Sequence, residues 1–202
     1  MTWVLALLLA SQPSAVDALT KGTLRLIGRF SAGHACPLSP RVALTNGHIV
    51  DQRPFDADVP AFPYAYSDGV GNAGFLVPVH ERLERARDLA AMEPLSESDL
   101  FANPFPVAAQ PPKEGDRIYL LGYSWKNKKS AMEDDVVEAR VSRVVALHVV
   151  FYPAGKPGSS GSCVVNEAGE VVAINEGAYE TDDKQEAGIA VGIWGSLKDM
   201  PQ

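Results

Sequence analysis

The sequence predicts an all-β protein built from two β-units of similar size. Short runs of β-branched and apolar residues recur along the chain, separated by Gly, Pro, Asn and Asp residues, which is typical of many short strands in a sandwich or in barrels. Helical periodicity is scarce by comparison. A proline-rich stretch at residues 101–112 divides the chain into near-equal halves, and such stretches favour extended, semi-rigid connections.

The clearest strands are expected where the apolar runs are most continuous. Residues 136–150 form the longest such run and predict either a hairpin or one long bent strand. Residues 79–87 fit a single helical turn or the edge of a strand, and residues 195–200 are expected to begin a short helix. The other expected strands are residues 23–27, 42–45, 117–121, 163–165, 171–175 and 188–193.

The N-terminal residues predict a secretory signal peptide over residues 1–18. Trp3 to Ala10 form a short apolar core, and small residues follow, with cleavage expected after Ala15 or Ala18. No Lys or Arg precedes this core, so a buried strand or an uncleaved anchor stays open as an alternative. The mature protein is therefore expected to be secreted or periplasmic and not bound to a membrane.

Composition argues against two classes of ligand. The 202 residues carry a formal net charge of −7 without a Lys or Arg run, so nucleic acid is not an expected partner. The two cysteines, Cys36 and Cys163, belong to no His/Cys cluster with metal-ligand spacing. We therefore expect neither a metal nor another cofactor.

Three segments carry, in order, the residue types that acyl transfer needs. They are A-L-T-N-G-H ending at His48, R-D-L-A-A around Asp88, and G-S-S-G-S-C around Ser160. A serine hydroxyl is a poor nucleophile until a base takes its proton, and imidazole suits this task because its pKa lies near 6.5. A carboxylate orients the imidazole, and backbone N–H groups in a glycine-rich turn can face the developing oxyanion.

These segments resemble those of the chymotrypsin-like (trypsin-like) serine proteases, and the resemblance covers residues 20–197. In that family an apolar strand ends in Thr-Ala/Asn-x-His, Asp-Leu-Ala follows, and Gly-x-Ser-Gly stands near the last quarter. The resemblance implies two antiparallel six-stranded Greek-key β-barrels with the active site in the cleft between them. It implies a serine endopeptidase that acts through an acyl-enzyme, with His48 as general base, Asp88 as its orienting carboxylate and Ser160 as nucleophile.

The resemblance also implies roles for the neighbours of these residues. The backbone N–H groups of Gly158 and Ser160 would form the oxyanion hole. Asn175, Glu176 and Gly177 would bind an extended protein or peptide substrate, and the charge of Glu176 would favour a basic side chain. The implied boundaries are residues 19–102 for the first barrel, 103–112 for the linker and 113–202 for the second barrel.

Details of the motifs are similar to the bacterial members of this family. The residues around His48 resemble the L-T-N-x-H of periplasmic quality-control proteases, and those after Ser160 resemble the same enzymes and the glutamyl endopeptidases. Ser159 stands where digestive enzymes carry an Asp used in activation, so activation by cleavage of a zymogen is not expected. Asn175 stands where glutamyl endopeptidases carry a pocket His, which argues against a strict preference for Glu.

The resemblance also bears on the two cysteines. It places Cys36 in the strand before His48 and Cys163 three residues after Ser160, behind the cleft and on facing barrels. A Cys36–Cys163 disulfide would join the two halves near the active site, and two buried free thiols are the equal alternative.

Plainer interpretations of the same residues remain. The other histidines are taken as structural or exposed, with a substrate contact left open for the first of them; they are His34, His80 and His148. The nucleophile elbow of α/β-hydrolases is excluded because no His follows Ser160. Two further functions stay open: a protease-like binding module that no longer cleaves, and an esterase on the same barrels.

Overall fold

The chain folds into two closed six-stranded antiparallel β-barrels, as the computed structural model shows. The prediction of an all-β protein with this architecture is confirmed. The structure describes residues 22–29, 31–50, 63–69, 71–125 and 132–194. The expected signal peptide and the helix expected at residues 195–200 lie outside these ranges. Every helix within them is too short to cross a membrane.

The first barrel closes through β1, which pairs with β2 on one side and with β4 on the other. The strand order is β1-β2-β3-β6-β5-β4. The one-turn helix α2 (Gly47–Val50) follows β3, and the short 3₁₀ helices η1 (Arg85–Arg87) and η2 (Glu97–Asp99) flank β6. The strands are β1 (Leu24–Ile27), β2 (Ala32–Ser39), β3 (Val42–Asn46), β4 (Tyr64–Ser67), β5 (Ala73–Glu84) and β6 (Leu89–Pro94).

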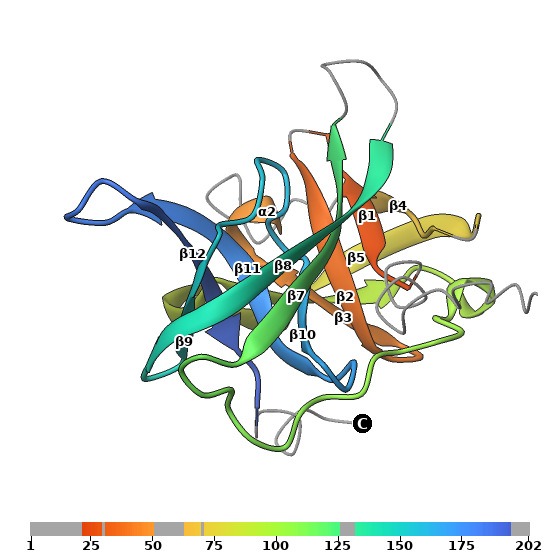
Figure 1. Cartoon of the computed structure of the whole chain (residues 1–202). Helices are drawn as coiled ribbons and strands as arrows, with labels where there is room; N and C mark the ends of the chain where they lie inside the picture. Colours follow the sequence, from red (N-terminus) through yellow and green to blue (C-terminus); the bar gives the residue numbers. More distant parts are fainter. Residues whose placement is uncertain (1–21, 30, 51–62, 70, 126–131, 195–202) are drawn as a thin grey trace, which may run out of the picture.

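The second barrel repeats the topology of the first. Its order, β10-β11-β12-β9-β8-β7, closes through the pairing of β7 with β10. The barrels lie side by side, and the hairpin of β11 and β12 extends beyond the second one (Figure 1). The strands are β7 (Arg117–Trp125), β8 (Met132–Val145), β9 (His148–Tyr152), β10 (Cys163–Asn166), β11 (Val171–Glu180) and β12 (Glu186–Gly192).

Two open choices about local structure are settled by the strand pairing. Residues 136–150 form a hairpin, because β8 turns back into β9 at Ala146 and Leu147. Residues 79–87 were expected to form a helical turn or the edge of a strand. They belong to the end of β5 and to the 3₁₀ helix η1, so both expectations were right in part. The strands β2, β4 and β6 were not among the clearest expected strands. Gly, Pro and Ala lower the intrinsic strand propensity of β2 and β6. Both segments are nevertheless strands, because β2 pairs with one edge of β3 and β6 pairs with the other.

The segment between β6 and β7 is attached to both barrels by backbone hydrogen bonds. Phe105 N donates to Pro37 O at 2.8 Å on the first barrel, and Ala108 N donates to Val171 O at 2.9 Å on the second. The Phe105 side chain is buried in a hydrophobic cluster that both barrels share. The proline-rich segment is thus part of the contact between the barrels.

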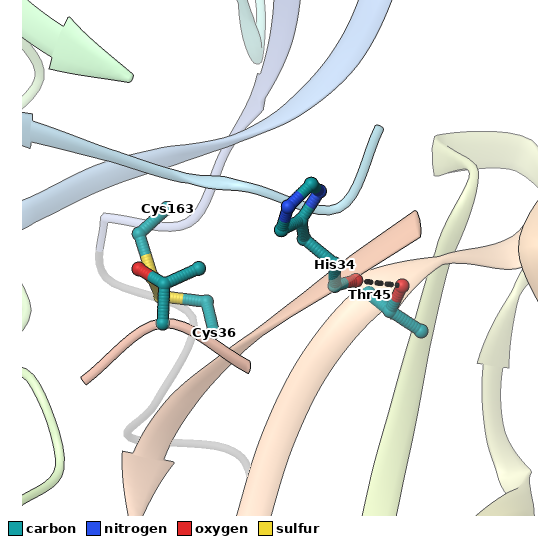
Figure 2. Close-up of a disulfide and its surroundings, with 5 residues drawn as sticks. His34, Cys36, Thr45 and Cys163 are labelled. Atoms are coloured by element: carbon teal, nitrogen blue, oxygen red, sulfur yellow. Dashed lines mark hydrogen bonds between the residues drawn. A yellow bond between two sulfur atoms is a disulfide. The ribbon is translucent and has the colours of Figure 1, made fainter. Parts of the chain in front are cut away.

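A disulfide joins the barrels inside the same cluster. Cys36 of β2 and Cys163 of β10 are both fully buried and bonded to each other, with 5.1 Å between their Cα atoms (Figure 2). The disulfide alternative is confirmed over the two free thiols. Cys36 lies one strand earlier than expected, because β3 is the strand that runs into His48.

Candidate active site

His48 and Asp88 lie against each other at the end of the first barrel. The Asp88 carboxylate accepts two hydrogen bonds from His48, one from Nδ1 at 2.6 Å and one from the backbone N at 2.8 Å. The Asp88 carbonyl accepts from Gly47 N at 2.9 Å and from Asn46 Nδ2 at 3.2 Å. Four hydrogen bonds therefore join Asp88 to the residues that lead from β3 into α2, and they fix the two side chains relative to each other.

Asp88 has an unusual backbone conformation that suits its residue type. It lies between η1 and β6 with a φ of +50°, in the left-handed region. Among residues with a side chain, Asp and Asn tolerate this region best. The conformation turns the chain back toward β3, which brings both the carbonyl and the carboxylate of Asp88 to the start of α2.

The Asp88 carboxylate also sets the protonation behaviour of the imidazole. Its hydrogen bond raises the pKa of His48 above the usual value, the negative charges of Asp88 and Glu176 act in the same direction, and partial burial opposes them. Since the carboxylate accepts from Nδ1, the neutral ring carries its proton there. Nε2 is left as the acceptor, and the His48 side chain is 49% exposed, so Nε2 can serve as a base for an incoming hydroxyl.

Ser160 follows a tight turn that its sequence explains. Ser159 N donates to Lys156 O at 3.0 Å, and Gly158 has a φ of +92°. A positive φ at the third position of such a turn defines type II, for which Pro followed by Gly is favoured, and Pro157-Gly158 occupy those positions. A Cβ at Gly158 would meet no atom within 4 Å, so backbone conformation rather than space requires glycine there.

The nucleophile candidate is held from both sides. Ser160 O accepts from His34 N of β2 at 2.8 Å, and the Ser160 hydroxyl donates to Glu176 O of β11 at 3.0 Å. The next residue, Gly161, donates its N–H to Asn175 O at 2.8 Å. Ser160 thus lies at the junction of the two barrels, with its side chain next to the strand expected to bind substrate.

The three residues expected to bind substrate differ in their surroundings. Asn175 is fully buried, and its Nδ2 donates to both O and Oγ of Ser159 at 3.0 Å. In this arrangement the amide braces the turn before Ser160, and the role of Asn175 in substrate binding stays a prediction. A Cβ at Gly177 would meet no atom within 4 Å, so the strand is open to a ligand there.

Glu176 lies in a β-bulge, since the β11–β12 register shifts between Asn175 and Gly177. Bulges redirect side chains and often lie beside active sites. Burial and the negative charge of Asp88 raise the pKa of Glu176, and the nearby His148 and His48 lower it. Its Oε2 lies 4.0 Å from His148 Nε2. The structure therefore adds a second carboxylate to the surroundings of the His48–Asp88 pair.

His34, the histidine for which the sequence left a substrate contact open, lies against the segment that carries Ser160. Its ring is buried at the junction of the barrels, 1% exposed, and burial lowers its pKa to about 4. Its carbonyl accepts from Thr45 Oγ1 at 2.6 Å. One signal could have located it: His34 and Cys36 are two apart on one strand, so both side chains face the same way.

In the part of the chain that the structure describes, no three His, Cys, Asp or Glu side chains are grouped closely enough to hold a metal ion.

The fold is that of a trypsin-like peptidase. Residues 33–174 match the trypsin-like peptidase domain family, and the chain belongs to that family. No curated protein matches the sequence closely enough to be counted as a relative.

Solved bacterial serine proteases have a similar fold. The active form of the Rv3671c protease from M. tuberculosis is 18% identical with a TM-score of 0.69, and the alignment covers 94% of this chain and 86% of that one. The serine endoprotease from Yersinia pestis is 17% identical with a TM-score of 0.70, over 93% of this chain and 65% of that one. At these identities the likeness is one of fold.

Proposed function

We propose that this chain is a serine endopeptidase in which Ser160, His48 and Asp88 form the catalytic triad. The observation that carries the proposal is the double hydrogen bond from His48 to the Asp88 carboxylate. It fixes the tautomer in which Nε2 is the base, and it stabilises the imidazolium that forms when Nε2 takes a proton. The matching family supports a peptidase rather than another hydrolase on this fold.

The first chemical step transfers the Ser160 proton to His48. The hydroxyl rotates from the Glu176 carbonyl toward His48 Nε2 when substrate occupies the cleft, since hydroxyl hydrogen bonds in ligand-free sites often rearrange on binding. Ser160 Oγ then attacks the scissile carbonyl, and the imidazolium returns the proton to the leaving amine. A water molecule, deprotonated by the same imidazole, hydrolyses the acyl-enzyme and frees the second product.

Gly158 and Ser160 supply the donors for the developing oxyanion. The intervening amide of Ser159 is used within the turn, where it donates to Lys156 O. The N–H groups of Gly158 and Ser160 have no protein partner among the described residues, so they are available to a ligand. Two preorganised backbone donors of this kind stabilise the tetrahedral intermediate more than they stabilise the substrate.

The substrate backbone is proposed to pair with the outer edge of β11. Pairing with β10 and the turn after Ser160 ends at Asn175, and residues 176–180 pair only with β12 in the described structure. An extended peptide can add to this free edge as a β-strand. Because the edge begins beside the Ser160 hydroxyl, a peptide bound there would pass the nucleophile.

We also propose that the protein works outside the cytoplasm, in a secreted or periplasmic form. The buried Cys36–Cys163 disulfide supports this location, because disulfides persist in oxidising compartments.

A cleavage profile tests the proposal and separates it from its alternatives. Purified protein is incubated with a diverse peptide library and with small esters, beside a Ser160→Ala control. Peptide cleavage that the control lacks is the expected result. Turnover of esters alone would indicate an esterase, and binding of peptides without turnover would indicate a binding module.

A further inference from the structure

Strand β2 of the first barrel is attached at two points to the segment that carries Ser160. His34 and Cys36 point from the same face of β2 toward the second barrel (Figure 2). Cys36 is bonded to Cys163, and His34 N donates to Ser160 O at 2.8 Å. The segment that carries Ser160 therefore meets β2 at Ser160 and again at Cys163.

The contact between His34 and this segment is close and dry. A Cβ at Gly161 would lie 2.0 Å from His34 O, and a Cβ at Gly122 would lie 3.4 Å from His34 Nε2. Glycine is thus required at Gly161 for the segment to approach this residue, whereas a Cβ at Gly122 would be in ordinary van der Waals contact with the ring. The backbone carbonyls of Gly158 and Ser160 also lie close enough to the ring to favour its protonated form, Gly158 more strongly. Nδ1 makes no hydrogen bond within the described structure, which leaves Nε2 as the ring nitrogen that can donate.

His34 therefore contacts the carbonyls of the two residues whose amides are the proposed oxyanion donors. Its backbone N–H holds Ser160 O, and its ring is directed to Gly158 O. We propose that His34 is a positioning residue that holds the oxyanion hole in its productive shape. This inference rests on the proposed function, and it adds a residue of the other barrel to the machinery for binding the oxyanion.

The physical reason lies in the flexibility of the turn. Glycine visits positive and negative φ about equally, so Gly158 alone does not fix the direction of its own N–H. An external donor on its carbonyl restricts the rotation of the residue. A neutral imidazole is a suitable anchor because, once buried, it offers one N–H in a fixed direction without an uncompensated charge.

Two substitutions separate positioning from simple packing. His34→Leu keeps much of the volume and removes the donor, whereas His34→Gln restores an N–H at a similar reach. For a cleaved peptide substrate we expect His34→Leu to lower kcat about 10- to 100-fold with a small change in KM. His34→Gln should recover most of this loss. A peptide aldehyde, which places an oxyanion in the hole, should lose affinity in parallel with kcat.

A measurement without turnover keeps the inference separate from the proposed function. In ¹⁵N-labelled protein, the ring N–H of His34 should be protected from exchange with water, and His34→Leu should shift the amide signals of Gly158 and Ser160 more than His34→Gln does. An unprotected ring N–H would overturn the inference even if His34→Leu fails to fold. So would an unchanged kcat in a folded His34→Leu. If the native protein cleaves nothing, the proposed function fails, and the NMR result still decides the role of His34.

Discussion

Removing the disulfide between the barrels should cost a large share of the stability of the fold. The perturbation is the double variant Cys36→Ala/Cys163→Ala. The two cysteines are 127 residues apart in sequence, and closing a loop of that length lowers the entropy of the unfolded chain by an amount worth about 5 kcal/mol. Measured values usually fall below this limit, so we expect a loss of between about 2 and 5 kcal/mol.

The assay is denaturant unfolding of the oxidised native protein, the double variant, and the native protein kept reduced. Oxidised protein should unfold at a clearly higher denaturant concentration than the other two, which should resemble each other. A thiol count on the denatured native protein without reductant should find none. A double variant within about 1 kcal/mol of the oxidised protein would refute the reasoning that this cross-link restrains the unfolded chain.

Three further predictions concern the ionisable groups of the site. Asp88→Asn keeps a residue suited to a φ of +50° and removes the charge, so kcat should fall about 10³- to 10⁴-fold, whereas the matched control Asp68→Asn should retain activity. Glu176→Gln removes one of the charges that raise the pKa of His48. The acid limb of the pH profile of kcat/KM, expected above pH 6.5 in the native protein, should therefore move to lower pH in this variant. An acid limb that does not move would count against the coupling between Glu176 and His48. Burial lowers the pKa of His34 in the folded protein from the usual 6.5 to about 4. The neutral ring therefore contributes fully to stability above pH 6.5, and this contribution is lost as pH falls toward 4, by up to about 3 kcal/mol. Unfolding midpoints at pH 6.5 and pH 4 should therefore differ more in the native protein than in His34→Gln, and equal slopes would contradict the burial argument.

Local sequence contained most of the information about the reactive residues. The Pro157-Gly158 pair predicts a turn by its own backbone preferences, and the structure shows a type II turn there. His48 and Asp88 occur in short motifs beside strands, and the pairing of β3 with β6 brings these motifs together. The long run of β-branched residues at 136–150 predicted a hairpin or one bent strand, and the structure decides for the β8–β9 hairpin.

Features that depend on contacts between distant segments were not predictable in this way. Strand β6, with the sequence L-A-A-M-E-P, has alanines that favour helix, and only pairing with β3 and β5 makes it a strand. The hydrogen bond from His34 N to Ser160 O joins the two barrels across more than a hundred residues, and no local pattern encodes it. The position of the Glu176 carboxylate follows from a bulge in β11, which the sequence alone does not locate.

Covalent labelling of Ser160 is a direct test of its proposed role as the nucleophile. The folded protein is treated with a fluorophosphonate probe, and the modified residue is identified by peptide mass spectrometry. Rapid labelling is expected at Ser160, and it should be lost in Ser160→Ala and strongly slowed in His48→Ala, because the hydroxyl reacts only when His48 takes its proton. Folded protein that is not labelled, or a His48→Ala variant labelled as fast as the native protein, would contradict it.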